Sequence, residues 1–585
     1  MRHPRRPCRV LVAALAVLAT AAGVAAAATP ASARTAGTWV KIESTCAHPG
    51  DTATFRCFAK KLVDVPAHTR GSAPLLASVG HGYGGGMSPG DLATFYGYNR
   101  SGGSGQTVGI VIWGNNPYIK TDLGTFENHY KLPAETSTSF RVVNQSGKTS
   151  PLPNSSNALT GTHGEISLDV EAVRAVCAKC KILLVEASVN GQGSPSDASL
   201  AAAEDTAVRL GATVVTNSWG GPEYSVSSTL TKAFQHQGVV ITASNGDDGW
   251  DGWDFVTSYG ASDNAPSYPS TSQYVVAVGG TTITPAANGT RSNEVVWNSN
   301  GNADSAVVDG ATGGGCSRLT AAPYFQASTP GYSALNCAGK RSGTDVAVDG
   351  DPQTGLSVYS KSEGGWARYG GTSLSSPLVA GMFALAGGSG GSSYPAASLY
   401  VNVNRLHKAT FDVTSGANGW CGTTAPDACS TAASTASKGR TNNPNGIYTK
   451  DVIDCTFART GKPVTTVPAK SSAECTATSG FDGPSGLGAV KGLSIFTDTS
   501  PGARLTGSTS RKVKQSGTYT AHLTPQHGAR ITSVTWLFGD GKKVTGKSYV
   551  VKHAWAKAGT YTVTFSACDS YGDFVLRKAT IHVKK

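Results

Sequence analysis

Two acidic side chains four residues apart, Glu165 and Asp169, form the first pattern in this sequence that could do chemistry. They lie in THGEISLDVEAVRAVC, residues 162–177, where apolar residues repeat at helical spacing. On such a helix the two carboxyl groups lie one turn apart on the same face. Because two adjacent carboxylates resist double ionisation, one pKa rises and that group becomes a usable proton acceptor or donor. A structural alternative stays open, in which Thr162 and Glu165 form a capping box and Asp169 is a solvated surface residue.

A candidate nucleophile, Ser373, stands in GGTSLSSP, directly before the apolar run LVAGMFALAG. The glycines predict a turn, and the apolar run predicts a buried helix that begins at this serine. At a helix start the backbone N–H and the positive end of the helix dipole can stabilise a developing oxyanion. The competing interpretation is a serine that only caps the helix.

A third acidic residue, Asp247, lies in ASNGDDG, residues 243–249, directly after the strand-like run VVIT. In α/β proteins, ligands bind outside the carboxyl ends of such strands. Taken alone, an aspartate in this position is better explained as a turn former.

Taken together, these stretches resemble the sedolisins, also called serine-carboxyl peptidases. GTHGEISLD, ASNGDDG and GGTSLSSP occur in the order and setting of that family, and the resemblance covers residues 85–490. Further similar segments are 268–281, 294–297, 313–317 and 345–347. The resemblance implies a subtilisin-like fold and an enzyme that hydrolyses peptide bonds in proteins or peptides.

The resemblance also implies roles for the candidate residues. Ser373 would attack the scissile carbonyl, Glu165 would act as its general base, and Asp169 would bond to Glu165 and orient it. Asp247 would help form the oxyanion hole, which requires a protonated carboxyl group and therefore predicts activity at acid pH. The segment after the strand-like run at 212–215 resembles a substrate-binding edge formed by Ser218, Trp219 and Gly220.

Two rival functions have to be weighed against this hypothesis. A subtilisin with an Asp/His/Ser triad could use His163, but the strand VGIVIWG ends in Ile112 and Trp113, where a subtilisin needs its aspartate. His163 is therefore interpreted as a structural residue at a helix entry. The second rival is a catalytically silent protein that binds an extracellular polymer or a cell wall on the same fold.

The resemblance further implies one structural calcium ion. Asp412 and Asp482 would supply carboxylate oxygens, and the carbonyls of Val413, Thr478 and Gly480 would complete a shell of hard oxygen ligands. Two turns built around aspartates are the structural alternative.

The elements around these residues predict an α/β domain. Unalternated apolar runs at 107–112, 181–185, 212–215, 238–242 and 274–278 are typical of parallel strands covered on both faces. A helical run at 196–210 lies between two of them, so we expect a doubly wound parallel sheet.

The sequence changes character near residue 500. In TYTVTFSA, residues 560–567, apolar side chains fall on every second position, which predicts strands with one buried face and a small all-β sandwich. WLFGDG followed by HAW and GTYTV resembles the PKD domain, an accessory module that could bind an extracellular polymer. We expect a signal peptide at 1–33, a short segment at 34–84, the peptidase domain at 85–498 and the PKD-like domain at 499–585.

The bulk properties agree with an exported globular protein. The 585 residues are 39% hydrophobic and 15% charged, with a formal net charge of +12. A basic start, an apolar stretch and the small residues Ala31-Ser32-Ala33 are typical of a secretory signal, and no later stretch is apolar enough to span a membrane. No cluster of basic and aromatic residues indicates nucleic-acid binding. We therefore expect a secreted, extracellular protein.

Cysteine usage agrees with an oxidising compartment. Ten of the twelve cysteines form close neighbours in sequence, which predicts local disulfides without fixing their connectivity. The neighbours are Cys46/Cys57, Cys177/Cys180, Cys316/Cys337, Cys421/Cys429 and Cys455/Cys475. Cys8 lies in the expected signal peptide, and Cys568 is left over. A redox or zinc role for Cys177 and Cys180 is disfavoured, because no second such pair or matching His pair occurs.

Overall fold

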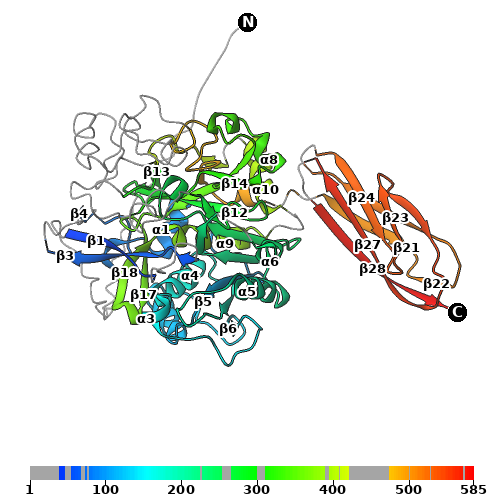
Figure 1. Cartoon of the computed structure of the whole chain (residues 1–585), viewed down its shortest axis with the longest axis horizontal. Coiled ribbons are helices and arrows are strands. Elements are labelled where there is room, and N and C mark those ends of the chain that lie inside the picture. Colours follow the sequence, from blue (N-terminus) through cyan, green and yellow to red (C-terminus); the bar gives the residue numbers. More distant parts are fainter. Residues whose placement is uncertain are drawn as a thin grey trace, which may run out of the picture.

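The structure is a computed structural model of the whole chain. It describes residues 39–46, 55–66, 73–75, 78–223, 227–252, 265–299, 310–388, 394–406, 409–419, 473–497, 499, 501–526, 529–570 and 574–585. Of these, the part up to residue 497 is mainly α/β and the part from 501 onward is all β (Figure 1).

A ten-stranded sheet lies at the centre of the α/β part. Neighbouring strands pair in parallel from β20 (Ala489–Val490) at one end to β6 (Phe140–Asn144) at the other. Two strands pair in antiparallel fashion: β13 (Arg291–Val296) with β12 (Val276–Pro285), and β19 (Thr410–Phe411) with β20. The sequence prediction of a parallel sheet is therefore confirmed. The spatial order is β19 (Thr410–Phe411), β20 (Ala489–Val490), β16 (Val346–Asp349), β12 (Val276–Pro285), β10 (Val240–Ser244), β8 (Val214–Asn217), β5 (Thr107–Trp113), β7 (Lys181–Ala187) and β6 (Phe140–Asn144).

Helices cover both faces of this sheet. A side chain at Gly109 of β5 would contact Ala207 of α5 (Asp197–Arg209). Thr216 of β8, in contrast, forms a hydrogen bond with Ser376 of α9 (Thr372–Leu385). Gly109 pairs with Val215, the residue before Thr216, and successive residues of a strand point to opposite faces. The two helices therefore lie on opposite faces, as in a doubly wound fold. The helices are α1 (Pro89–Tyr96), α2 (Ile119–Tyr130), α3 (Asn157–Thr160), α4 (His163–Val176), α5 (Asp197–Arg209), α6 (Ser228–Ala233), α8 (Tyr324–Ala327), α9 (Thr372–Leu385) and α10 (Pro395–Leu406).

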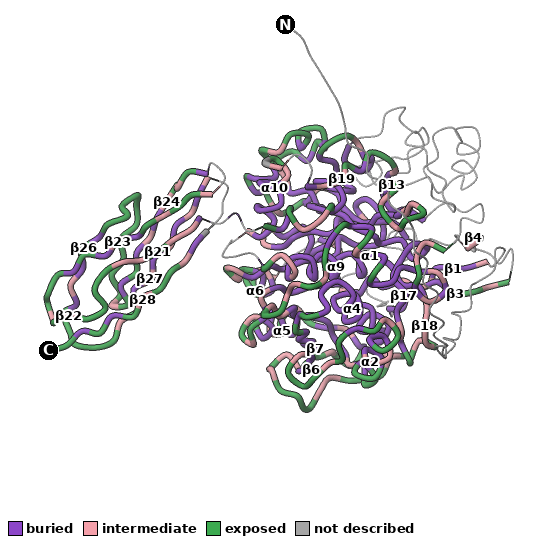
Figure 2. The backbone as a smooth tube through the Cα atoms, turned by 180° about the vertical axis from the view of Figure 1, so that it is seen from behind, coloured by how far each residue is buried: buried purple, intermediate pink, exposed green. Residues whose placement is uncertain are grey.

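Helices α4 and α9 are the elements that carry the candidate catalytic residues. Every residue of α4 is buried, and the buried part of α9 runs from Thr372 to Ala384. Gly381 of α9 lies directly against Val176 of α4, where a Cβ would approach to 2.9 Å. The starts of the two helices are joined by Ser218, whose hydroxyl contacts both Asp169 of α4 and the Ser373 carbonyl of α9. They form one buried region, shown in purple in Figure 2.

The N-terminal strands add to the α/β part rather than standing apart from it. β1 (Trp39–Ser44) pairs with β3 (Lys60–Val65), and β3 continues onto β18 (Gly365–Gly370). β2 (Arg56–Cys57) instead pairs with β9 (Trp219–Pro222). The other small strands are β4 (Ala73–Pro74), β11 (Ser267–Tyr268), β14 (Cys316–Ala321), β15 (Lys340–Ser342) and β17 (Leu356–Ser360).

The C-terminal part is a sandwich of two sheets with its own core, as the sequence predicts. One sheet has the order β21-β23-β26 and the other β22-β28-β27-β24-β25. Trp536, Trp555 and Phe565 lie at the centre of its core, and the cluster of buried residues around them comes from this part alone. The strands are β21 (Gly502–Gly507), β22 (Ser510–Lys512), β23 (Gly517–Thr524), β24 (Ile531–Leu537), β25 (Lys543–Gly546), β26 (Val550–His553), β27 (Gly559–Asp569) and β28 (Phe574–Lys584).

Three of the expected disulfides are present: Cys46–Cys57, Cys177–Cys180 and Cys316–Cys337. Because the sulfurs of Cys177 and Cys180 are bonded to each other, neither is available as a zinc ligand. Cys475 is also disulfide-bonded, whereas Cys421, Cys429 and Cys455 lie outside the described residues. Cys568 is free. Among the described residues, no helix combines the length and the apolar character needed to cross a membrane.

Candidate active site

The carboxyl pair predicted on one helix lies in the first turns of α4. Glu165 and Asp169 are both completely buried, so the interpretation of Asp169 as a solvated surface residue is wrong. The capping-box alternative is also wrong, because the Thr162 side chain makes no cap bond and its hydroxyl donates to Thr160 instead. Both carboxyl groups are therefore available for other partners.

The candidate nucleophile lies at the second position of α9. The helix cap is Gly371, so the interpretation of Ser373 as a capping serine is wrong. Gly371 has a φ of +86°, which a glycine adopts without strain. The Ser373 hydroxyl donates to the carbonyl of Ser218, with an Oγ–O distance of 3.2 Å. It also accepts the N–H of Phe58 at 3.1 Å.

Asp247 lies beside the start of α9, as its position after β10 predicts. Its Oδ1 accepts both the N–H and the hydroxyl of Thr372, at 2.8 and 2.9 Å. Its Oδ2 is buried and has no hydrogen-bond partner. Burial raises the pKa of Asp247 to about 6, opposed by the nearby charge of Lys60 and by the bonds from Thr372. A protonated Oδ2 in this position can donate a hydrogen bond to a developing oxyanion.

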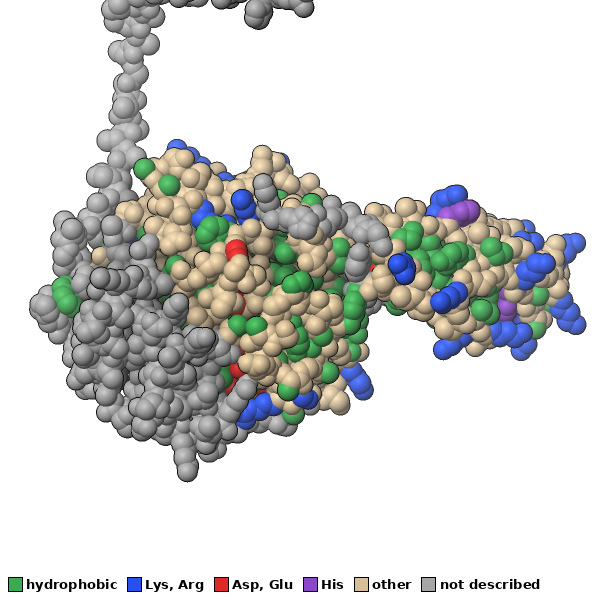
Figure 3. Space-filling model, turned by 90° about the horizontal axis from the view of Figure 1, so that it is seen from above, with side chains coloured by type: hydrophobic (Ala, Val, Ile, Leu, Met, Phe, Trp, Pro, Cys, Tyr) green, Lys and Arg blue, Asp and Glu red, His purple; other side chains and the backbone are tan. Residues whose placement is uncertain are grey.

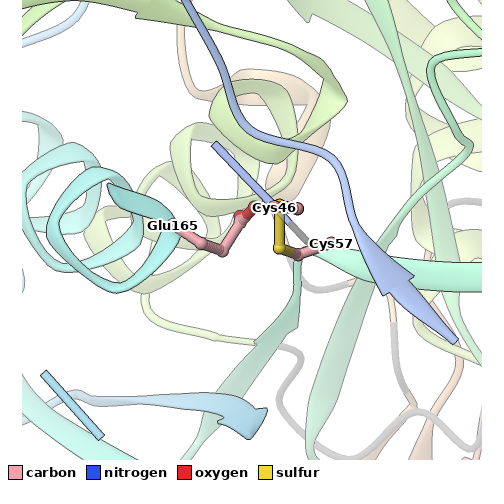
Figure 4. A group of neighbouring side chains, drawn as sticks. All are labelled: Cys46, Cys57 and Glu165. Atoms are coloured by element: carbon pink, nitrogen blue, oxygen red, sulfur yellow. Dashed lines mark hydrogen bonds between the residues drawn. A yellow bond between two sulfur atoms is a disulfide. The ribbon is translucent and has the colours of Figure 1, made fainter. Parts of the chain in front are cut away.

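The environment of Glu165 strongly favours its neutral form. Burial is the main cause that raises the pKa of Glu165 well above its usual range, and the charge of Asp169 adds to it. The Ser373 hydroxyl and the N–H of Ala59 oppose this rise, and Ala59 donates to Oε2 at 2.7 Å. The Cys46 sulfur lies 3.4 Å from the same oxygen (Figure 4). A disulfide sulfur has no proton to donate, so this is a packing contact.

Asp169 is held by Ser218 rather than directly by Glu165. The Ser218 hydroxyl donates to Asp169 Oδ1 at 2.5 Å and lowers a pKa that burial raises well above its usual range. The other oxygens, Glu165 Oε1 and Asp169 Oδ2, are buried without hydrogen-bond partners. Two carboxyl oxygens bond to each other only when one carries a proton. The pair is therefore arranged to retain a proton in a site closed to solvent.

The expected substrate edge offers backbone groups rather than side chains. The indole of Trp219 is buried and donates to the carbonyl of Val111, so it points into the core. Gly220 has no room for a side chain, because a Cβ would lie 2.3 Å from the Ser267 hydroxyl. The backbone of this edge is already paired with β2 of the same chain.

The contacts of Ser218, Thr372, Phe58 and Ala59 were not predicted from the sequence. Ser218 was expected only at the substrate edge, yet its hydroxyl also fixes Asp169. Thr372 precedes the predicted nucleophile, and its bond to Asp247 could have been guessed from that position. Phe58 and Ala59 carry no signal beyond the neighbouring Cys57.

His163 does not take part in this cluster. It is the first residue of α4, and its Nε2 lies 2.8 Å from the carbonyl of Ser155. This agrees with a structural residue at a helix entry and removes the support for an Asp/His/Ser triad.

The two halves of the expected calcium site come together. The side chain of Asp412 accepts the N–H of Gly480 at 3.1 Å, and Asp482 accepts the N–H of Thr478 at 2.9 Å. Asp482 is completely buried, and burial with a smaller contribution from Asp412 raises its pKa to about 8. Val413 is buried next to Asp412. A buried carboxylate with an acidic neighbour fits a hard cation, which would neutralise both charges.

Comparison with known proteins agrees with this geometry. The pattern of the subtilase family matches residues 143–398, and that of the PKD domain matches residues 498–583. The chain is 29% identical to xanthomonalisin of Xanthomonas sp. (strain T-22) over 394 residues, 61% of this chain and 45% of that protein. It is 35% identical to sedolisin of Pseudomonas sp. (strain 101) over 188 residues, 32% of this chain and 30% of that protein. The aligned part spans less than half the length of either relative.

A solved structure supports the same fold. Pseudomonas sedolisin, a serine-carboxyl proteinase complexed with two molecules of pseudo-iodotyrostatin, matches with a TM-score of 0.51 at 24% identity. The match covers 69% of this chain and 95% of that chain. The chain thus carries a subtilase/sedolisin-like catalytic domain, homologous to the serine-carboxyl peptidases, followed by a C-terminal PKD domain.

Proposed function

We propose that this protein hydrolyses peptide bonds in protein substrates through Ser373, Glu165, Asp169 and Asp247, and that it works best at acid pH. The observation that carries the proposal is the buried cluster at the start of α4 and α9. It brings a serine hydroxyl together with two proton-retaining carboxyl groups and a third carboxyl with a free buried oxygen. The homology to serine-carboxyl peptidases supports the same assignment.

In the proposed mechanism, the Glu165/Asp169 pair holds one proton on Asp169, so that Glu165 is ionised. The Ser373 oxygen then attacks the carbonyl carbon of the substrate while Glu165 takes the hydroxyl proton. Glu165 returns that proton to the nitrogen of the leaving amine. A water molecule then hydrolyses the ester on Ser373 by the same steps in reverse. Asp169, fixed by the Ser218 hydroxyl, positions Glu165 and tunes its pKa. The negative charge that develops on the carbonyl oxygen lies near Asp247 and the start of α9.

The acid preference follows from Asp247 in this mechanism. A neutral carboxyl donates a hydrogen bond to the oxyanion, whereas an ionised one repels it. Because its pKa is raised to about 6, Asp247 is neutral in acid and ionised above neutrality. Activity should therefore fall as the pH rises through this value.

Secretion and a calcium ion complete the proposal. The leader-like start and the local disulfides support export into an oxidising compartment. Asp412 and Asp482 would bind one Ca²⁺ together with the carbonyls of Val413, Thr478 and Gly480. The ion would stabilise the fold by tying the loop after β19 to the loop before β20.

A second function, binding of an acidic extracellular polymer, is favoured by the charge of the PKD domain. Residues 501–585 contain 14 Lys and Arg but only three Asp, while the whole chain has a net charge of +12. Figure 3 shows Lys and Arg side chains distributed over the domain that extends to the right. Such a surface fits a polyanion better than a neutral polymer. A purely polymer-binding role is disfavoured because the full catalytic cluster is present.

The test of the peptidase compares the purified protein with the Ser373→Ala variant on denatured protein at about pH 4 and about pH 7, since carboxyl pKa values centre near 4. Peptide release by the wild type at the lower pH, and none by the variant, is the expected result. Equal release by both proteins at acid pH would overturn the assignment.

A further inference from the structure

One face of the five-stranded sheet in the PKD domain lies in solvent. The sheet contains β22, β28, β27, β24 and β25, labelled in Figure 1 except for β25. In β27, Val563 and Phe565 point into the core, so Thr564 between them points away from it. Thr564 lies opposite Leu537 of β24 and Lys578 of β28, which therefore share its face. We call this the outer face of the sheet.

The outer face carries no carboxyl group among the described residues. The two acidic residues described in the domain have other positions. Asp569 is buried, and Asp540 lies in the loop between β24 and β25, where it pairs with His553 at 2.9 Å. The cations of the outer face are therefore not neutralised by anions on the same surface.

Four exposed lysines are spread over the outer face: Lys512, Lys543, Lys578 and Lys584. Lys543 and Lys578 lie in one row across the sheet and are three strand spacings apart, which is about 14 Å. Lys584 follows Lys578 on β28 by about 20 Å and lies next to Lys512 on β22. A bound anion chain would therefore meet positive charge along the length of the face.

Hydroxyl groups fill the space between these lysines. The face contains Thr535, Thr545, Thr560, Thr562, Thr564 and Thr580. Thr562 and Thr580 lie directly opposite each other and are exposed, and their hydroxyls have no hydrogen-bond partner among the described residues. A hydroxyl group both donates and accepts hydrogen bonds, so it can pair with sugar hydroxyls as well as with carboxylates.

The composition of the outer face disfavours two other kinds of ligand. Among the described residues it has no Phe, Tyr or Trp, the side chains on which the bases of single-stranded nucleic acids stack. It also has no Arg, the residue that binds phosphate in bidentate fashion. Its large apolar side chains are Leu537 and Leu576, which is too little for the apolar centre of a stable protein interface.

We propose that the outer face binds a linear polysaccharide that carries carboxylate groups. The lysines pair with the carboxylates, and the threonine hydroxyls bond to the hydroxyls of the sugars. This inference rests on the proposed second function and specifies its site and its ligand. Binding would hold the peptidase domain near proteins embedded in the polymer and raise their effective concentration.

The experiment measures binding of the full-length protein to polygalacturonate at about pH 7, where carboxylates with pKa values near 4 are ionised. Neutral dextran and single-stranded DNA with the same number of charges are measured alongside. We expect polygalacturonate to bind, dextran not to bind, and DNA to bind at least about 10-fold more weakly, because DNA lacks a stacking partner on this face. Added salt should weaken the binding of polygalacturonate.

Two double variants with the same loss of charge test the location. Lys578→Gln with Lys584→Gln removes cations from the outer face and should weaken binding roughly 10-fold. Arg504→Gln with Lys552→Gln is the matched control, because both residues are exposed on β21 and β26 of the other sheet. The control should change the Kd by less than about 2-fold. Thermal unfolding should be the same for both variants, since all four side chains lie on the surface.

A third variant separates the hydroxyls from the charge. Thr562→Val with Thr580→Val keeps the size and the strand preference of the side chains and leaves the net charge unchanged. We expect polygalacturonate to bind about 5-fold more weakly, with the same salt dependence, because hydrogen bonds are lost and ion pairs are kept.

Three results would overturn the assignment. An equal loss of binding in the two charge variants would mean that the charge acts diffusely, and it would remove the site while leaving polymer binding in place. DNA that binds as tightly as polygalacturonate would remove the polysaccharide as the ligand. A wild type that binds neither polyanion would remove the second function together with this site, and none of these results depends on peptidase activity.

Discussion

Replacing Asp247 by Asn isolates the group proposed to set the upper pH limit of activity. The amide oxygen can still accept the two bonds from Thr372, because Oδ1 receives both of them. The amide nitrogen takes the place of Oδ2, which is buried without a partner beside the Phe58 carbonyl. The variant therefore keeps a hydrogen-bond donor toward the oxyanion at every pH.

The expected effect follows from the pKa of Asp247, which burial raises to about 6. The share of neutral Asp247 is about 99% at pH 4, half at pH 6 and about 1% at pH 8, which follows from a tenfold change per pH unit. The kcat/KM of the wild type should therefore fall about tenfold per pH unit above pH 6. In Asp247→Asn this fall should disappear or move upward by at least one unit.

The pH dependence of the unfolding free energy should also change in the same variant. A buried carboxyl whose folded pKa is raised makes its largest contribution to stability at low pH, where it is neutral in both states. That contribution is lost as the pH rises from about 4 to about 6, by about 3 kcal/mol in all. Asn does not titrate, so the unfolding free energy of Asp247→Asn should depend less on pH in this range.

The assay measures kcat/KM on a peptide substrate, together with thermal unfolding, from about pH 3 to about pH 8. Asp351→Asn is the matched control, because Asp351 is also buried with a pKa raised to about 6 but lies outside the candidate site. It should flatten the stability profile and leave the activity profile unchanged. An activity profile of Asp247→Asn that superposes on that of the wild type would refute the role given to Asp247.

Three further predictions concern the base, the calcium site and the PKD domain. Glu165→Gln keeps the shape of the side chain but cannot take a proton, so kcat should fall roughly 100-fold to 10,000-fold with little change in thermal stability; a variant with wild-type kcat would exclude Glu165 as the base. Calcium at 100 times its Kd stabilises the folded state by about 2.7 kcal/mol, so chelation should lower the melting temperature of the wild type. Chelation should not affect the melting temperature of Asp482→Ala, and equal responses of the two proteins would argue against the site. A chain that ends at residue 497 should retain peptidase activity but lose salt-sensitive binding to a polyanion, because the PKD domain has its own core and most of the net positive charge; unchanged binding would place the polymer site elsewhere.

The sequence predicts the fold well where buried strands and helices carry a local pattern. The apolar runs at 107–112 and 181–185 became the adjacent parallel strands β5 and β7, and the period of 162–177 became α4. The spacing of Glu165 and Asp169 sufficed to place both carboxyl groups in one region, because a helix fixes the geometry of residues four apart.

What could not be predicted depends on contacts between distant parts of the chain. Ser218 reaches Asp169, 49 residues away in sequence, through a hydroxyl that has no distinguishing local motif. Phe58 meets Ser373 across 315 residues, through backbone groups that every residue carries. The complete burial of Asp169 is likewise a property of the packing of α4 against its neighbours, so the solvated alternative could not be rejected beforehand.

Trapping the covalent intermediate tests the central claim most directly. An ester substrate lets an acyl-enzyme accumulate, because its acylation is faster than that of an amide. After an acid quench and digestion, mass spectrometry should find one acyl group on the peptide that contains Ser373, and none in Ser373→Ala. Steady turnover without any adduct on Ser373 would contradict the account, since it would mean that the carboxyl pair activates water directly.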